Sequence, residues 1–291
     1  MESKVEKVKL SNGVEMPILG YGVYQIPPEK TEECVLNALK SGYRSIDTAF
    51  AYQNEVEVGK AIKKSGIPRE ELFITTKVFV FDAGYEKTKE AFNRSLERLG
   101  LDYIDLYLIH LPFGDNFGSW RAMEELYEAK KVRAIGVSNF AWLKLMDFCS
   151  KVKIVPMVNQ FEFNPFWQRK NDMQIMKKYN IVAEAWGPLG EAKPELLNDP
   201  TIVEISKKYN KTPAQVILRF INQLGVVAIP KTVNIQRMEE NINIWDFKLD
   251  DDDMQKMKSL DKNKALLLDY DDLPSILSFW DLLDSFKKNL K

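Results

Sequence analysis

Short apolar runs rich in β-branched residues alternate with amphipathic stretches along most of the chain. Each run is nearly continuous, which is typical of a strand covered on both faces of a parallel sheet. The stretches between the runs repeat apolar residues at helical spacing. The predicted strands are 18–22, 44–49, 72–78, 104–110, 132–138, 155–161, 181–186 and 226–231. Helical patterns between them include 31–41, 55–65, 84–99, 118–130, 141–150, 168–178 and 213–224.

Eight strands with helices between them predict an α/β fold in which a parallel sheet closes into a (β/α)₈ barrel, the TIM barrel. A barrel of about 250 residues is commonly one domain, so we expect residues 1–291 to form a single barrel domain. Residues 8–17 predict a β-hairpin, with its turn at Asn12-Gly13, that covers one end of the barrel. An extra helix is expected at 200–209. The Asp cluster within 249–262 suits the positive end of another helix.

The tail, residues 263–291, ends in a further helical pattern. The apolar residues Ile276, Phe279, Trp280, Leu283 and Phe286 fall close to one face of that helix. The pattern favours packing of the tail on or near the barrel. Covering the substrate mouth and making a dimer contact are the alternatives.

Composition narrows the classes of function. Lys and Arg number 41 and Asp and Glu number 42, so the net charge of −1 indicates neither a nucleic-acid partner nor a membrane surface. Only Cys34, Cys149 and one histidine are present, too few for a disulfide framework or a zinc or haem site of the usual type. The start of the chain lacks an apolar signal region, and no apolar run reaches about 18 residues. We therefore expect a cytoplasmic protein without a metal.

Seven of the predicted strands end in a polar, charged or large aromatic residue. The active site of a barrel of this kind is built at the carboxyl ends of its strands. Each residue alone has a structural explanation, such as a helix cap for Asn139, but chance would have to supply the whole set. The strand-end residues are Asp47, Lys77, His110, Ser138, Asn139, Asn159, Gln160, Trp186, Lys231 and Thr232, and Tyr52 lies in the loop after Asp47.

Asp47, Tyr52, Lys77 and His110 together have a coherent chemistry. A carboxylate keeps a buried lysine charged, and we expect Asp47 to do so for Lys77. The charged Lys77 should then lower the pKa of Tyr52 from about 10 toward the working pH, so that Tyr52 protonates a developing alkoxide. A neutral His110 could hold the carbonyl oxygen. This quartet lacks a nucleophile, a metal and an electron source, and a hydride from a bound nicotinamide would complete the reaction.

The chain resembles the aldo-keto reductases, and in particular their microbial aldehyde and ketone reductases. The resemblance runs from about residue 7 to residue 262 and is carried by the segments 42–62, 73–78, 96–110, 136–140, 159–165 and 229–241. It implies NADPH-dependent reduction of a small-molecule carbonyl compound to an alcohol. It also implies that Tyr52 is the acid, that Asp47 and Lys77 tune it, and that His110 orients the substrate.

The resemblance further implies where NADPH binds. Ser138, Asn139 and Gln160 would bind the nicotinamide carboxamide, and Trp186 would stack on the nicotinamide ring. Lys231, Thr232 and Arg237 would hold the 2′-phosphate, since two cations and a hydroxyl near a helix start suit a phosphomonoester. Glu240 and Asn241 would contact the adenine. The remaining implied cofactor contacts are Gly22, Val23, Asp47, Gly187, Leu189, Val233 and Asn234.

The substrate pocket is less well determined. Its candidates are Tyr24, Phe50, Phe79 and Leu111, and packing at the barrel rim explains each of them equally well. Family members often have tryptophan where Phe79 and Leu111 stand and histidine where Asn164 stands. These differences lie in the substrate pocket and not in the quartet, so they leave the identity of the substrate undetermined and the reaction type unchanged. We expect a monomer, with a dimer as the alternative. Two other functions remain: a non-catalytic cofactor-binding subunit of a larger assembly, and the same enzyme oxidising alcohols with NADP⁺.

Overall fold

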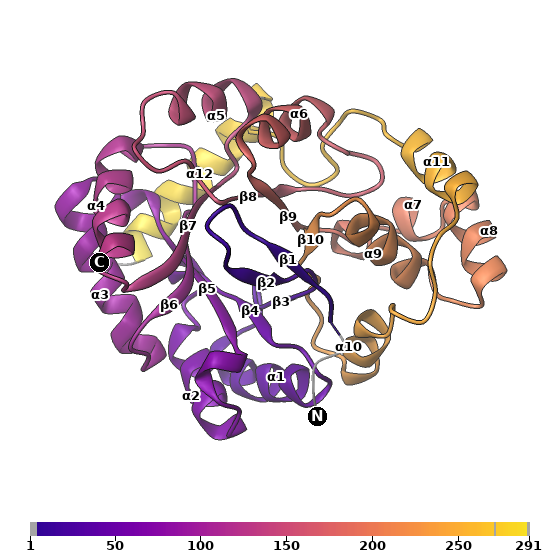
Figure 1. Cartoon of the computed structure of the whole chain (residues 1–291), viewed down its shortest axis with the longest axis horizontal. Coiled ribbons are helices and arrows are strands. Elements are labelled where there is room, and N and C mark those ends of the chain that lie inside the picture. The colour runs from indigo at the N-terminus through magenta and orange to yellow at the C-terminus, as the bar shows by residue number, and fades with distance from the viewer. Residues whose placement is uncertain (1–4, 271, 290–291) are drawn as a thin grey trace.

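The barrel predicted from the alternating pattern is present in the computed structural model, which describes residues 5–270 and 272–289 (Figure 1). Eight parallel strands follow one another around it in chain order. They are β3 (Tyr21–Gly22), β4 (Ser45–Asp47), β5 (Phe73–Val78), β6 (Ile104–Ile109), β7 (Val132–Ser138), β8 (Val158–Glu162), β9 (Val182–Trp186) and β10 (Val227–Ala228). A parallel bridge between Leu19 and Ala228 joins the first strand to the last.

Helices cover the outside of the strands (Figure 1). The surrounding helices are α1 (Pro28–Lys40), α2 (Glu55–Ser65), α3 (Tyr85–Leu99), α4 (Asn116–Glu128), α5 (Trp142–Cys149), α6 (Lys170–Tyr179), α9 (Pro213–Gln223) and α10 (Ile235–Ile242). The additional ones are α7 (Pro194–Leu197), α8 (Pro200–Tyr209), α11 (Asp251–Ser259) and α12 (Leu273–Asn289). Because helices lie outside and packed side chains inside, every residue of β5, β6 and β8 is buried.

Most element boundaries differ from the predicted ones by a few residues. Helix α1 begins earlier than expected, at Pro28, because proline is well tolerated in the first turn, where its missing amide hydrogen costs nothing. Strand β10 is shorter than the predicted 226–231, since Pro230 has no amide hydrogen to extend the ladder. Helix α7 was not predicted from the sequence.

The predicted hairpin consists of β1 (Lys7–Lys9) and β2 (Glu15–Pro17) in antiparallel pairing. The side-chain amide of Asn12 donates to the carbonyl of Arg133, near the start of β7, at 2.9 Å. The hairpin therefore covers the amino-terminal end of the barrel, which faces the viewer in Figure 1. This leaves the carboxyl ends of the strands for the site.

The tail lies against the opposite, carboxyl-terminal end. The buried carboxylate of Glu162 accepts hydrogen bonds from the amides of Leu266, Leu267 and Leu268, at 2.8 to 3.2 Å. Helix α12 follows and buries Leu283. No helix in the described ranges has both the length and the apolar character needed to cross a membrane.

Candidate active site

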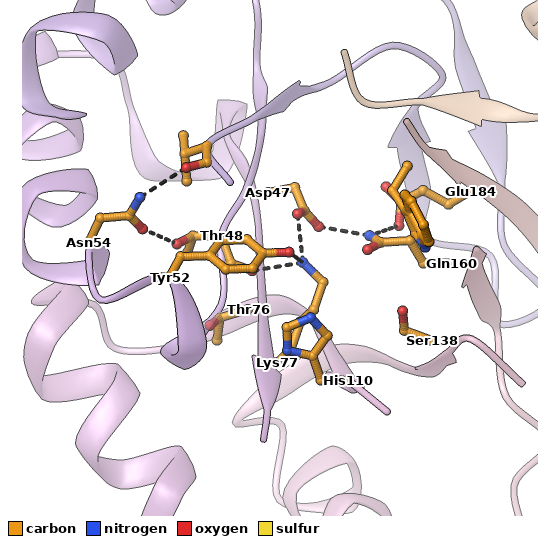
Figure 2. Close-up of polar contacts among 12 residues, drawn as sticks. Asp47, Thr48, Tyr52, Asn54, Thr76, Lys77, His110, Ser138, Gln160 and Glu184 are labelled. Atoms are coloured by element: carbon orange, nitrogen blue, oxygen red, sulfur yellow. Dashed lines mark hydrogen bonds and ion pairs between the residues drawn. The ribbon is translucent and has the colours of Figure 1, made fainter. Parts of the chain in front are cut away.

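The four residues expected to carry chemistry come together at the carboxyl ends of β4, β5 and β6 (Figure 2). The ammonium of Lys77 lies 2.6 Å from Oδ1 of Asp47 and 3.3 Å from the hydroxyl oxygen of Tyr52. The rings of Tyr52 and His110 meet edge to face, with centroids 5.6 Å apart. Segments far apart in the chain thus build one cluster.

The strand register explains this meeting. Asp47 ends β4 opposite Thr75 of β5. Side chains alternate between the two faces of a strand, so Lys77 projects to the same side as Thr75. The amide of His110 continues the ladder beyond β6 by donating to the carbonyl of Val78 at 3.0 Å. All three polar groups therefore lie close to the carboxyl ends of neighbouring strands.

Tyr52 belongs to a short 3₁₀ turn, Phe50–Tyr52, that follows β4. The hydroxyl of Thr48 donates to the side-chain oxygen of Asn54 at 2.8 Å. The amide nitrogen of Asn54 donates in turn to the carbonyl of Val23 at 3.0 Å. Both side chains are buried and hold the loop that carries Tyr52. The sequence offered no signal for them, because their partners are defined only in the folded chain.

Lys77 is fully buried, and its three donors are all used. They go to Asp47, to the carbonyl of Thr48 at 3.0 Å, and to the oxygen of Tyr52. Since an ammonium has no acceptor, the oxygen of Tyr52 must accept from Lys77. The hydroxyl hydrogen of Tyr52 is therefore free to point to another molecule.

The expectation that Lys77 lowers the pKa of Tyr52 was wrong. Burial, followed by the charge of Asp47, raises the pKa of Tyr52 well above its ordinary value of 10.0. The physical reason is that Asp47 stands 2.6 Å from the ammonium and cancels most of its field at the phenol. Desolvation of the phenolate then dominates, and Tyr52 keeps its proton.

His110 is held as a neutral ring. Burial, and then the charge of Lys77, lower its pKa well below 6.5. Its Nδ1 is buried without a hydrogen-bond partner in the described part of the chain. Phe79 contacts the ring on another side, with centroids 5.6 Å apart. The other ring nitrogen, Nε2, is not among the buried polar atoms that lack a partner and bonds to no described residue, so it is the nitrogen that keeps access to solvent.

Asn139 ties three strands together. Its amide nitrogen donates to the carbonyl of His110 at 3.1 Å and to the hydroxyl of Ser138 at 3.0 Å. Its side-chain oxygen accepts from the indole of Trp186 at 2.9 Å, which fixes the plane of that ring. The alternative that Asn139 caps a helix is not met, because α5 follows Ala141 and has no side-chain cap.

Gln160 extends the quartet toward β9. Its amide nitrogen donates to Oδ2 of Asp47 at 2.8 Å and to Oε2 of Glu184 at 2.9 Å. Glu184 is fully buried. Sequence reasoning missed Glu184, which stands inside an apolar strand; a lone acid in such a run is the signal that could have found it.

The residues expected to hold the phosphate and adenine follow β10. Lys231 and Arg237 are exposed, and neither forms an ion pair within the described ranges. Thr232 accepts from the amide of Asn234 at 3.2 Å, and Asn234 caps α10 by accepting from the amide of Arg237 at 3.0 Å. Val233 is exposed, Asn241 is buried, and Glu240 accepts from Thr212 at 2.7 Å. Asn234 and Glu240 thus also have structural roles.

The remaining cofactor candidates lie at the rim of the barrel. Gly22 ends β3, Val23 follows it and is buried, and Leu189 packs partly on the core. Gly187 has a left-handed φ of 59°. A Cβ there would lie 2.7 Å from Cδ1 of Leu267, so the tail packs directly on this loop.

Three of the four substrate-pocket candidates meet the tail. Phe79 and Leu111 are buried in one cluster with Leu283 of α12, and Phe50 packs against it. Phe286 of α12 meets Phe79 edge to face, with centroids 5.6 Å apart. Tyr24 is 49% exposed, and its ring lies 5.0 Å from that of Tyr52. Helix α12 therefore forms part of the apolar wall beside His110.

Known proteins resemble this chain in sequence and in fold. Residues 17–262 match the family described as Aldo/keto reductase family. Glyoxal reductase of Bacillus subtilis is 49% identical over 90% of this chain and 95% of its own length. An aldo-keto reductase from a Medee basin deep-sea metagenome superposes with a TM-score of 0.89 at 46% identity, covering 91% of this chain and 99% of that chain.

A second similar structure was solved with a nucleotide. The aldo-keto reductase of Bombyx mori, in complex with NADP, is 30% identical with a TM-score of 0.86 and covers 92% of this chain and 95% of its own. The matched family covers most of the chain, including the strand ends that carry the quartet. This chain is therefore a member of the aldo/keto reductase family.

Proposed function

We propose that the protein is an NADPH-dependent reductase of aldehydes and ketones. The observation that carries this proposal is the buried chain from Asp47 to Lys77 to the hydroxyl of Tyr52, with distances of 2.6 and 3.3 Å. Glyoxal reductase, the relative of this protein described above, is named for glyoxal, which is a dialdehyde. All of these groups come from one chain, so a monomer suffices for the reaction.

The residues present fit NADPH. Lys231 and Arg237 are exposed cations without ion-pair partners in the described ranges, as a 2′-phosphate requires. Ser138 keeps a hydroxyl hydrogen to donate, and Gln160 keeps a carbonyl oxygen to accept, which suits both ends of a carboxamide. Trp186 offers an indole face held by Asn139. Bound NADPH supplies a hydride to the carbonyl carbon of the substrate.

Tyr52 delivers the proton in this proposal. Its raised pKa keeps the phenol protonated until the substrate oxygen gains charge, and its oxygen already accepts from Lys77. The hydroxyl hydrogen passes to the substrate oxygen, and the ammonium of Lys77 stabilises the phenolate left behind. His110, neutral, holds the substrate oxygen from the side. General acid catalysis of this kind contributes about 10²–10⁴-fold.

Reduction of a panel of aldehydes and ketones, measured as the fall in NADPH absorbance, tests the proposed activity directly.

Arg237→Ala should separate the two nicotinamide nucleotides. The wild-type protein should prefer NADPH to NADH. In Arg237→Ala the KM for NADPH should rise about tenfold or more, because a charged hydrogen bond is lost. The KM for NADH, which lacks the 2′-phosphate, should change less than about twofold.

Arg121→Ala is the matched control for Arg237→Ala. Arg121 is an exposed arginine on α4, outside the barrel, and its loss should leave both constants unchanged. Equal changes for the two nucleotides in Arg237→Ala would contradict the phosphate assignment. Absence of NADPH consumption with every carbonyl compound would contradict the proposed function itself.

Leu283→Ala should broaden the substrate range. Leu283 is only 6% exposed and packs with Phe79 and Leu111, so its truncation opens space in the apolar wall. We expect kcat/KM for a bulky aromatic aldehyde to rise about tenfold relative to glyoxal, since apolar-pocket changes are worth about 1–3 kcal/mol. Steady-state kinetics with the two aldehydes measure this ratio.

Leu282→Ala provides the comparison within the same helix. Leu282 is 61% exposed, so its removal changes the helix but not the wall. The ratio should stay at the wild-type value in this variant. An identical shift in both variants, or none in Leu283→Ala, would mean that α12 does not bound the substrate pocket.

A further inference from the structure

We propose that Glu184 is a positioning residue, which fixes the side chain of Gln160 with its carbonyl oxygen turned toward the nicotinamide carboxamide. This inference rests on the proposed function. Glu184 itself touches neither substrate nor cofactor. It acts through Gln160, and it does so in its neutral form.

The first step concerns the direction of the Gln160 amide. Its nitrogen lies between two carboxyl groups, 2.8 Å from Oδ2 of Asp47 and 2.9 Å from Oε2 of Glu184 (Figure 2). An amide nitrogen has two hydrogens and can serve both acceptors. Turned over, the amide would place its carbonyl oxygen against Oδ2 of Asp47, which has no hydrogen to donate. Asp47 therefore sets which way the amide faces, and Oε2 of Glu184 accepts its second hydrogen and holds it there.

The second step concerns the carbonyl oxygen of Gln160. It accepts no hydrogen bond from the described residues, since the contacts of this side chain are those of its nitrogen. It is also absent from the buried polar atoms that lack a partner, so it retains access to solvent although Gln160 is only 2% exposed. An acceptor held open in this way suits the NH₂ of a carboxamide.

The third step concerns charge. Asp47 and Glu184 are two buried acids, and Lys77 is the buried cation beside them. Lys77 pairs with Asp47 at 2.6 Å, whereas Oε1 of Glu184 has no partner in the described part of the chain. An ionised carboxylate with a single hydrogen bond and no ion pair is costly in the interior. The proton therefore stays on Glu184, and Asp47 carries the charge.

The groups that act on Glu184 agree with this distribution. Burial first, and then the charge of Asp47, raise the pKa of Glu184 to about 8, while Gln160 and Lys77 oppose the shift. A charged Glu184 would also raise the pKa of Tyr52 further and weaken it as an acid. Neutral Glu184 thus accepts from Gln160 without adding a second negative charge near Tyr52.

Two variants of the full-length protein test the role. Glu184→Gln keeps a neutral acceptor for Gln160 but has no ionisable group. Glu184→Leu has neither an acceptor nor an ionisable group. We measure the binding of NADPH by quenching of tryptophan fluorescence, and the pH profile of kcat/KM. Glu184→Leu should weaken NADPH about tenfold with kcat changed less than about threefold, since one oriented hydrogen bond is lost.

Glu184→Gln should bind NADPH within about twofold of the wild-type protein. Wild-type kcat/KM should fall as the pH rises through about 8, where Glu184 ionises, and Glu184→Gln should lack this alkaline decline. An unchanged decline in Glu184→Gln, or equal affinity of Glu184→Leu and wild type for NADPH, would overturn the proposal.

A double variant excludes a merely structural effect. If Glu184 acts only through Gln160, the variant with both Gln160→Leu and Glu184→Leu should bind NADPH no more weakly than Gln160→Leu alone. Additive losses of NADPH affinity in the double variant would contradict the proposal.

Glu55→Gln is the matched control for a buried glutamate. Glu55 is 2% exposed and accepts a hydrogen bond from Thr76, so the substitution should reduce stability without changing the affinity for NADPH or the pH profile of kcat/KM.

The outcomes also separate this proposal from the proposed function. Because fluorescence quenching requires no turnover, it reports on Gln160 even if no carbonyl compound is reduced. NADPH binding that depends on Glu184, without carbonyl turnover, supports the positioning role and contradicts the reductase. No binding of NADPH to the wild-type protein would overturn both.

Discussion

Tyr52→Phe should lower kcat for carbonyl reduction by about 10²–10⁴-fold while leaving the Kd for NADPH within about twofold of the wild-type value. The variant removes one hydroxyl, which is the only group of the quartet that can donate a proton to the substrate oxygen while its own oxygen is held by Lys77, 3.3 Å away. The ring stays in place against His110. Single-turnover kinetics for reduction and fluorescence quenching for NADPH measure the two quantities separately.

Tyr24→Phe is the control for this variant. The ring of Tyr24 lies 5.0 Å from that of Tyr52, but Tyr24 is 49% exposed and has no contact with Lys77 in the described ranges. We expect kcat within about threefold of the wild-type value. A Tyr52→Phe enzyme that still turns over normally would remove Tyr52 as the acid, and a comparable loss in Tyr24→Phe would make the effect one of pocket shape.

Lys77→Met should be the most damaging variant for both stability and activity. It leaves the carboxylate of Asp47, which is only 2% exposed, without the cation that stood 2.6 Å away. Breaking a buried ion pair by removing one partner costs about 3–5 kcal/mol, and we expect Tm to fall by about 10 °C. Reduction should also fail, because the phenolate of Tyr52 would form without a cation. Thermal unfolding and kcat measure the two effects.

The variant that combines Asp47→Asn with Lys77→Met separates these effects. It removes both charges, so it should regain most of the lost stability while remaining inactive. Lys7→Met is a surface control, since the pair of Lys7 with Glu15 is 56% and 63% exposed and such pairs contribute about 0–1 kcal/mol. Retained stability and activity in Lys77→Met would show that the 2.6 Å contact carries neither role.

The barrel and the quartet were predictable because both follow from repeated local patterns. Continuous apolar runs separated by amphipathic helices leave few topologies, and a parallel barrel brings the carboxyl ends of its strands to one end. The chemistry could then be inferred from Asp47, Lys77 and His110 at those ends, with Tyr52 one loop away. Boundaries were less certain, since proline and helix caps shift them by a few residues.

The pKa of Tyr52 was not predictable in the same way. Reasoning from residue types expected Asp47 to keep Lys77 charged, and the charged Lys77 to lower the pKa of Tyr52. The distance of 2.6 Å between Lys77 and Asp47, and the burial of the phenol, reverse that direction. Glu184 shows the same limit, because a glutamate in an apolar strand acquires a role only when Gln160 and Asp47 stand beside it.

The sequence by itself determined the order of the elements, the closure into a barrel and the residues at the strand ends, because hydrophobic periodicity acts locally. Only the tertiary structure decided which acid carries charge and where the tail lies. The apolar face of α12 could have met many surfaces, and the anchoring of Leu266 to Leu268 by Glu162 brings it to Phe79 and Leu111. Contacts and electrostatic energies depend on distances between residues remote along the chain, which no local pattern records.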